Sequence, residues 1–206
     1  MEDINNKMLA LIMIGGQSKR MGGGNKSLIE FNNKKIFDKI LERIKPQIEN
    51  IIINCNDEEE KLKKYKIPII KDIKKGYLGP LAGIHSAMHW ISSNKPEIKW
   101  LITLPGDTPF IPRNLVSSFK NKISSESKII LVQSNYKTHP IIGAWHTSLL
   151  SSLNSQLDKG LRKIMTWAKL YPIDYINYPT ESYDPFFNIN TKEDINKAIE
   201  IERNFL

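Results

Sequence analysis

Residues 8–26 read Met-Leu-Ala-Leu-Ile-Met-Ile-Gly-Gly-Gln-Ser-Lys-Arg-Met-Gly-Gly-Gly-Asn-Lys, an apolar run followed at once by a glycine-rich loop. The apolar run has the length and composition of a buried β-strand. Five glycines among the thirteen residues from Ile14 to Lys26 allow backbone N–H groups to turn toward an oxyanion without interference from a Cβ atom. Lys19, Arg20 and Lys26 add positive charge. The stretch therefore predicts a strand that leads into a phosphate-binding loop, and hence a protein that binds a nucleotide.

The spacing within this loop excludes two common phosphate-binding motifs. A Walker A loop has glycine directly before its lysine, whereas Asn25 precedes Lys26 here. The dinucleotide fingerprint G-x-G-x-x-G fits the loop in no register. The loop is therefore of a third kind.

The rest of the chain alternates short apolar runs with segments of helical periodicity, which indicates an α/β protein with an open, mostly parallel sheet covered by helices on both faces. We expect a single domain over residues 1–206, because this length fills one such domain and is short for two. The predicted strands are 8–14, 51–54, 68–70, 100–104, 129–133, 141–145 and 173–176.

Helical segments are predicted from apolar stripes and from capping signals. One stripe precedes Pro46, a second follows Gly79-Pro80, and Thr191 with Asp194 forms an N-cap signature for a last helix. The first stripe consists of Ile36, Phe37, Ile40, Leu41 and Ile44, and the second of Leu81, Ile84, Met88 and Ile91.

Composition limits the possible functions. Hydrophobic residues make up 40% of the chain and charged residues 25%, and no apolar run approaches the ~20 residues that cross a bilayer. The first seven residues lack the features of a secretion signal, so we expect a cytoplasmic protein without a membrane span. The only cysteine, Cys55, follows an apolar run and is expected to be buried without a catalytic role.

The net charge of +8 suits anionic ligands but is also compatible with nucleic-acid binding. Many lysines lie in polar stretches such as 58–66 and 120–128, without the interleaved aromatic residues of a stacking platform. We therefore expect a lysine-rich solvated surface and no nucleic-acid partner.

Polar residues lie at the carboxyl ends of four predicted strands. The glycine loop follows the first strand, Asn54 and Asn56 the second, Asp72 the third and Asp107 the fourth. Ligands of open parallel sheets collect at this edge, so the four strand ends are predicted to form one site.

Asp107 is the candidate metal ligand. It lies in Leu-Pro-Gly-Asp-Thr-Pro, where two prolines and a glycine make a rigid turn after a buried strand. Mg²⁺ binds one or two carboxylates and completes its shell with phosphate oxygens and water. The residues alone also allow an aspartate that only caps the turn. Lys26 and Arg20 could likewise neutralise phosphate charge or belong to a solvated loop.

Seven segments, in the same order along the chain, resemble the molybdenum cofactor guanylyltransferase family. The opening loop is similar to that family's signature Leu-Ala-Gly-Gly, three variable residues, Arg-Met-Gly, two variable residues and Asp-Lys. The other six segments are Ile-Asn-Cys-Asn (53–56), Lys-Asp (71–72), Gly-Pro-Leu-Ala-Gly (79–83), Pro-Gly-Asp-Thr-Pro-Phe-Ile-Pro (105–112), His-Pro (139–140) and Phe-Asn-Ile-Asn-Thr (187–191).

The resemblance implies a Rossmann-like nucleotidyltransferase that transfers GMP from GTP to molybdenum-molybdopterin with Mg²⁺ and releases pyrophosphate. It implies catalytic roles for Lys26, Arg20 and Asp107, the last also as metal ligand, and transient contact with cofactor insertion proteins or molybdoenzymes. The N-terminal half would hold the nucleotide and the C-terminal half the pterin. The nucleotide residues implied are Met13, Ile14, Gly15, Lys26, Asn54, Asp72 and Asp107; the pterin residues are His139, Asn188 and Asn190.

Two positions depart from the family pattern: Ile14 stands for alanine and Asn25 for aspartate. We expect altered nucleotide affinity from these changes and the same reaction. Alternatives are a CTP-dependent or sugar-phosphate nucleotidyltransferase of the same fold, or a non-catalytic protein that binds a nucleotide or the pterin. The presence of Asp107 argues against the last of these.

Overall fold

The computed structural model describes residues 7–15, 26–57, 59–76 and 79–206. Seven strands of this part form one sheet in the order β5-β4-β1-β6-β8-β7-β9. Every predicted strand is present, with ends that differ by a few residues. The strands are β1 (Met8–Ile14), β4 (Ile51–Cys55), β5 (Ile69–Ile70), β6 (Trp100–Pro105), β7 (Ile129–Ser134), β8 (Lys137–His146) and β9 (Ile173–Tyr178).

The sheet is mostly parallel, as predicted. β1 pairs in parallel with β4 and β6, β4 with β5, and β7 with β9. β8 runs antiparallel to both of its neighbours, β6 and β7. The carboxyl ends of β5, β4, β1 and β6 therefore lie side by side at one edge of the sheet, and the first residues of β8 lie at the same edge.

Side chains of β1 alternate between two apolar cores, one on each face of the sheet. Ala10 and Ile12 belong to the first core and Leu9 and Leu11 to the second. This alternation follows from the two-residue period of a strand, and burial on both faces explains the continuous apolar run in the sequence.

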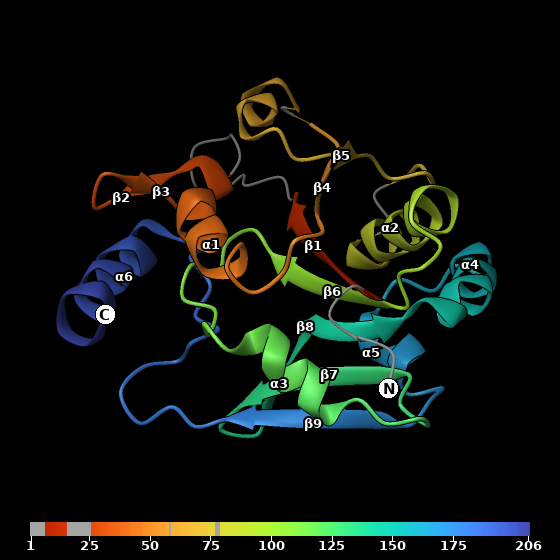
Figure 1. Cartoon of the computed structure of the whole chain (residues 1–206). Helices are drawn as coiled ribbons and strands as arrows, with labels where there is room; N and C mark the ends of the chain where they lie inside the picture. Colours follow the sequence, from red (N-terminus) through yellow and green to blue (C-terminus); the bar gives the residue numbers. More distant parts are fainter. Residues whose placement is uncertain (1–6, 16–25, 58, 77–78) are drawn as a thin grey trace.

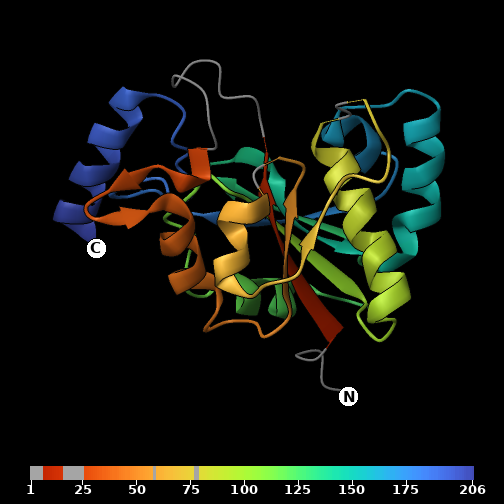
Figure 2. The same ribbon diagram turned by 90° about the horizontal axis from the view of Figure 1, so that it is seen from above.

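Helices cover both faces of the sheet, in agreement with the prediction (Figures 1 and 2). In Figure 2 the two groups of helices stand on opposite sides of the strands. The first core receives residues from α1 (Ile36–Ile44), α3 (Leu115–Lys122) and α6 (Lys192–Phe205), and the second from α2 (Pro80–Asn94), α4 (Leu150–Asp158) and α5 (Ile164–Ala168).

The predicted stripes of α1 and α2 are buried throughout. α1 ends at Ile44, just before Pro46, and α2 begins at Pro80, where the fixed φ angle of proline suits the first helical turn. The capping box of α6 is also confirmed, because the Thr191 side chain accepts from the backbone N–H of Asp194 and the Asp194 side chain accepts in return. Cys55 is buried, as expected.

The segment Glu30–Lys35 contains a small hairpin that the apolar pattern did not predict. β2 (Glu30–Phe31) and β3 (Lys34–Lys35) are joined by Asn32 and Asn33, which both have positive φ angles. Two asparagines between short strands are a known signal for such a turn, but the strands are too short to show periodicity.

Short 3-10 segments, η3 (Lys26–Leu28), η4 (Glu59–Tyr65) and η5 (Thr147–Leu149), complete the described elements.

β8 begins four residues earlier than predicted. It forms a hairpin with β7, and the register shifts where Val132 pairs with His139 and Leu131 pairs with Gly143. Pro140 lies in the irregular part, because proline has no N–H group for the ladder.

Within the described residues, no helix has the length and apolar character needed to span a membrane.

Candidate active site

Four neighbouring strand ends carry the predicted nucleotide residues to one edge of the sheet. Met13 and Ile14 end β1, and Gly15 follows them. Met13 pairs with Asn54 of β4 on one side and with Pro105 of β6 on the other. Because the order of these strands is β5-β4-β1-β6, their loops form one continuous row, as the sequence predicted.

The side chain and the backbone of Ile14 lie in different surroundings. The Ile14 side chain is buried in the core that contains α1, whereas its backbone lies at the last position of β1. The β-branched side chain that replaces the alanine of the family pattern therefore points into the protein interior and not toward the row of strand ends. Gly15 is exposed, and a Cβ atom there would meet nothing within 4 Å.

Asn54, Asn56 and Asp72 form a hydrogen-bonded cluster at the ends of β4 and β5. The side-chain amide of Asn54 donates to one carboxylate oxygen of Asp72 over 3.0 Å, and that of Asn56 donates to the other over 2.9 Å. The backbone N–H of Asp72 donates to Asn56 Oδ1 over 2.8 Å. Asn54 lies inside β4 and is buried, so it does not follow the strand as predicted. The cluster fixes the orientation of the Asp72 carboxylate.

Packing against the strand ends explains why the segment 79–83 has a glycine at position 83, in α2. A Cβ atom at this position would lie 2.6 Å from Asn54 Oδ1 and 2.8 Å from Met13 Cε. The absence of a side chain therefore allows α2 to pack directly against the ends of β1 and β4. Gly83 is a structural requirement of the site, and its role follows from packing that only the folded chain reveals.

Asp107 lies in the turn after β6, and three close contacts hold this turn. The backbone N–H of Gly106 donates to the carbonyl of Met13 over 2.9 Å. A Cβ atom on Gly106 would lie 2.4 Å from Ser27 Oγ, so only glycine fits between β1 and η3. The Asp107 carbonyl accepts from the backbone N–H of Ile189 over 2.9 Å, which fastens the segment before α6 to the turn.

Burial raises the pKa of the Asp107 carboxyl group, and the positive charge of Lys26 opposes this shift only in part. A carboxylate that is desolvated and incompletely neutralised attracts a cation. Thr108 contributes a hydroxyl group that lies 2.6 Å from Asn188 Oδ1 and 3.5 Å from Asp107 Oδ1. Thr108 was not predicted as a site residue, although its position next to Asp107 could have suggested it.

Lys26 and Asn190 meet at the same site. Lys26 Nζ donates to Asn190 Oδ1 over 2.8 Å, which joins two residues that are 164 positions apart in the sequence. The backbone N–H of Asn190 donates to the Asp194 side chain of the capping box over 2.9 Å. The predicted residues Lys26, Asp107, Asn188 and Asn190 are thus brought together by η3, the turn after β6 and the segment that leads into α6.

The donor set fits a metal ion that arrives with phosphate groups and does not fit an ion held by the protein alone. No group of three or more His, Cys, Asp or Glu side chains that could hold a metal occurs in the described part of the chain. Asp107 supplies one buried carboxylate, which is what Mg²⁺ needs when phosphates and water complete its shell. The side-chain oxygens of Asn188 and Asn190 already accept from Thr108 and Lys26.

His139 of β8 is tied into the protein. Its Nε2 lies 2.6 Å from Ser134 Oγ and 4.0 Å from Asp184 Oδ2, and its ring packs against Phe186 with the centroids 5.0 Å apart. Burial lowers the pKa of this histidine, although Asp184 opposes the shift. These contacts hold His139 at the start of β8, and its contact with the pterin stays a prediction. Arg20 and Asn25 lie outside the described residues.

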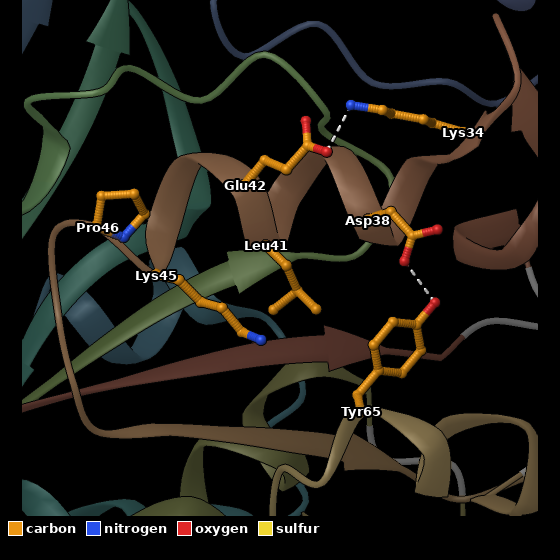
Figure 3. Close-up of a pocket in the computed structure, with 7 residues that line it drawn as sticks. All are labelled: Lys34, Asp38, Leu41, Glu42, Lys45, Pro46 and Tyr65. Carbon is orange, nitrogen blue, oxygen red and sulfur yellow. Dashed lines mark hydrogen bonds and ion pairs between the residues drawn. The ribbon is translucent and has the colours of Figure 1, made fainter.

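A groove of about 440 Å³ lies beside α1, away from these residues (Figure 3). Lys34 Nζ lies 2.6 Å from Glu42 Oε1, and the Tyr65 hydroxyl donates to Asp38 over 2.6 Å. These polar groups satisfy one another, so we assign no site to the groove. Its lining residues are Lys34, Asp38, Leu41, Glu42, Lys45, Pro46 and Tyr65.

The fold and the row of polar strand ends are those expected of a nucleotidyltransferase, and the comparisons with known proteins agree. Residues 10–171 match the MobA-like NTP transferase domain. The chain belongs to the molybdenum cofactor guanylyltransferase family. It is 35% identical over 190 residues to the molybdenum cofactor guanylyltransferase of Nitrobacter hamburgensis, covering 91% of each chain. It is 34% identical over 208 residues to that of Brucella ovis, covering 95% of this chain and 92% of the relative.

Solved structures agree with this assignment. Molybdopterin-guanine dinucleotide biosynthesis protein A from Archaeoglobus fulgidus superposes with a TM-score of 0.76 at 25% identity, over 96% of this chain and 100% of that one. The 4-diphosphocytidyl-2C-methyl-D-erythritol synthase of Anaerococcus prevotii superposes with a TM-score of 0.73 at 15% identity, over 98% of each chain, which indicates a shared fold. The protein is therefore an enzyme of the nucleotidyltransferase type.

Proposed function

We propose that this enzyme transfers GMP from GTP to the terminal phosphate of molybdenum-molybdopterin with Mg²⁺. A phosphate oxygen of the acceptor attacks the α-phosphorus of GTP and forms a new P–O bond, while the bond between the α-phosphorus and the bridging oxygen breaks. Pyrophosphate leaves with the electron pair of that bond. The products are the guanine dinucleotide form of the cofactor and pyrophosphate.

The observation that carries the proposal is the group formed by Asp107, Lys26 and Asn190 beside the end of β1. It combines a buried carboxylate whose pKa is raised by burial with a lysine held 2.8 Å from an asparagine oxygen. Phosphoryl transfer depends on alignment and charge stabilisation more than on a strong base. Among the described residues, the site brings together a buried carboxylate and a lysine, which suits this chemistry.

Each residue has a defined part in the proposal. Lys26 binds the phosphates of GTP and neutralises charge on the leaving pyrophosphate, with Arg20 as a second donor. Asp107 would hold Mg²⁺, and the metal would supply a positive charge that polarises the phosphate oxygens. The described backbone around Asp107 is fixed by Gly106 and Ile189, so the carboxylate is positioned before the substrates arrive.

The guanine ring is assigned to the cluster of Asn54, Asn56 and Asp72 and to the backbone of Met13, Ile14 and Gly15. Guanine presents two adjacent donors, N1–H and the exocyclic amine, and a carboxylate is their natural acceptor. Each oxygen of Asp72 accepts one asparagine N–H and retains further lone-pair capacity. Asn54 and Asn56 thereby orient the carboxylate. Guanine can donate to the remaining lone pairs of Asp72 without breaking either of these hydrogen bonds.

The acceptor is assigned to the side of β8 and of residues 188–190, and Mg²⁺ to Asp107. The names of the relatives support guanylyl transfer to a molybdenum cofactor. Contact with cofactor insertion proteins or molybdoenzymes and a cytoplasmic location stay predictions.

Release of pyrophosphate from GTP in the presence of Mg²⁺ and molybdenum-molybdopterin tests the proposal. We expect turnover that requires all three components, and thermal stabilisation by GTP with Mg²⁺ that exceeds the stabilisation by ATP, CTP or UTP. Preference for CTP would overturn the choice of nucleotide and retain the reaction. Stabilisation by GTP without any pyrophosphate release would instead favour a protein that binds the nucleotide and does not turn it over.

A further inference from the structure

The turn between β7 and β8 places a tyrosine in a backbone conformation that side chains other than glycine, asparagine and aspartate rarely adopt. Asn135 and Tyr136 have φ angles of 45° and 64°. The β2–β3 hairpin uses the same kind of turn with Asn32 and Asn33, at 49° and 60°. Asparagine tolerates this left-handed region because its short polar side chain can bond locally, whereas a bulky residue is strained there.

Within the described residues, no contact of the Tyr136 side chain offsets this strain. The Tyr136 side chain is 81% exposed, and no other described residue hydrogen-bonds its hydroxyl group or stacks on its ring. An asparagine or glycine would serve the turn better. A strained and exposed residue of this type indicates a role in binding.

The backbone that carries the ring is nevertheless rigidly held. The N–H group of Tyr136 donates to the Asn177 side chain over 3.1 Å, and that of Asn135 donates to the carbonyl of Tyr178 over 3.4 Å. The N–H group of Thr180 donates to the Asn135 side chain over 3.3 Å. β9 and Thr180, two residues beyond its end, thus fix the turn, and the ring projects from a fixed point.

The turn lies at the edge of the sheet that holds Asp107. β8 runs antiparallel to β6, so its first residue and the preceding turn lie toward the end where β6 finishes. His139, close behind the turn, contacts Phe186, which precedes Asn188 and Asn190 in the chain. In Figure 1 the end of β9 and the long connection into α6 extend toward the same side of the molecule as the arrowhead of β6.

We propose that the Tyr136 ring binds the acceptor by stacking on its planar heterocycle. The inference rests on the proposed function, because it takes the acceptor to be a phosphate joined to a flat, fused ring system. With the phosphate beside Asp107, the ring system of the acceptor extends from the end of β6 past the start of β8. An aromatic ring on a rigid turn binds such a surface with little loss of conformational freedom.

Replacement of Tyr136 by glycine separates binding from folding. The Tyr136→Gly enzyme loses the ring and gains a residue suited to a positive φ angle, so its Tm is expected to equal or exceed that of the wild type. Its KM for molybdenum-molybdopterin is expected to rise about five- to tenfold, with KM for GTP unchanged. Tyr136→Phe keeps the ring and is expected to retain KM for the acceptor. Tyr175→Ala removes another exposed tyrosine, from β9, and serves as the matched control with unchanged kinetics.

The outcomes distinguish this inference from the proposed function. An active wild-type enzyme whose KM for the acceptor is the same in the Tyr136→Gly variant would overturn the role of Tyr136 alone. A fall in Tm with parallel changes in both KM values would also overturn it, because a structural residue behaves in that way. A wild-type enzyme without GTP-dependent pyrophosphate release would overturn the proposed function and, with it, the acceptor assigned to Tyr136.

Discussion

The two ends of the proposed site, the base end for guanine and the phosphate end, differ in how they are built. At the base end, Asn54, Asn56 and Asp72 come from adjacent parallel strands, lie within 19 residues of one another in the sequence and satisfy one another's hydrogen bonds. At the phosphate end, Lys26 and Asp107 meet the segment before α6, which comes from the far end of the chain.

This difference has an electrostatic counterpart. The carboxylate of Asp72 accepts from two asparagine amides, whereas burial raises the pKa of Asp107 and Lys26 offsets this effect only in part. The base end is therefore complete without a ligand, and the phosphate end retains a charge that a cation would neutralise. A preformed base site beside an incompletely neutralised phosphate site is the arrangement expected when the metal arrives with the nucleotide.

Removal of the charge on Asp107 tests the phosphate end most severely. We expect Asp107→Asn to lower turnover by ~10² to 10³ and to lower GTP binding much less, because the metal acts mainly on charge that develops in the transition state. Steady-state pyrophosphate release and calorimetric GTP titration measure the two quantities. Glu200→Gln, which removes an exposed carboxylate on α6, is the control and is expected to behave as the wild type. Near-normal turnover of Asp107→Asn at limiting Mg²⁺ would refute the metal assignment.

Lys26 is expected to act in both the ground state and the transition state. Lys26→Ala should weaken GTP binding and turnover together, by roughly tenfold or more in each, since the lysine contacts phosphates throughout the reaction. Lys19→Ala should have little effect, because Lys19 occupies a variable position of the loop signature. If the two variants behave alike in GTP titration and turnover, the charge of the loop acts diffusely and the assignment to Lys26 is wrong.

Inosine triphosphate tests the base end, because it keeps the N1 donor of guanine and lacks the exocyclic amine. The wild type is expected to prefer GTP over ITP by ~1 to 3 kcal/mol. Asp72→Ala should reduce this preference and leave the Mg²⁺ requirement intact. Asn56→Ala gives a useful comparison, since it removes both hydrogen bonds between Asn56 and Asp72 while the carboxylate itself remains. An unchanged GTP-to-ITP ratio in Asp72→Ala would limit Asp72 to a structural role.

The smallest expected effect is the pH dependence of stability caused by Asp107. Its folded-state pKa is raised above 3.8, so folding favours the protonated form. The stabilising contribution is fully present below pH 3.8 and is lost as the pH rises through the folded-state pKa. At neutral pH without ligands, Asp107→Asn should therefore have the higher Tm. Thermal unfolding across this range should show the gap closing toward acid pH; a constant gap would contradict the prediction.

Much of the fold followed from local patterns in the sequence. The seven apolar runs became the seven strands of the sheet, and the stripes of α1 and α2 became buried faces. The capping box at Thr191 was also predicted. The hairpin at Asn32 and Asn33 was missed, because strands of two residues show no periodicity. The start of β8 was missed because Pro140 interrupts the ladder at an irregular register.

The candidate site followed in part from the strand-end rule. That rule placed Asn54, Asp72 and Asp107 in one row because parallel strands share an edge. It gave no reason for Gly83 and Gly106, whose importance depends on atoms from other elements that approach within 3 Å of a Cβ position. It also gave no partner for Thr108, which bonds Asn188 at a separation of 80 residues.

The sequence by itself determined the order of strands and helices, the glycine loop and the polar residue types at the strand ends, because these depend on periodicity, backbone freedom and short-range capping. The tertiary structure alone decided which side chains bond one another across distant segments. It joined Lys26 to Asn190, turned the Ile14 side chain into the core and placed Tyr136 on a hydrogen-bonded turn at the end of the sheet where β6 finishes. Contacts between distant segments arise from the way that both faces of the sheet are covered, and no local pattern in the chain encodes that packing.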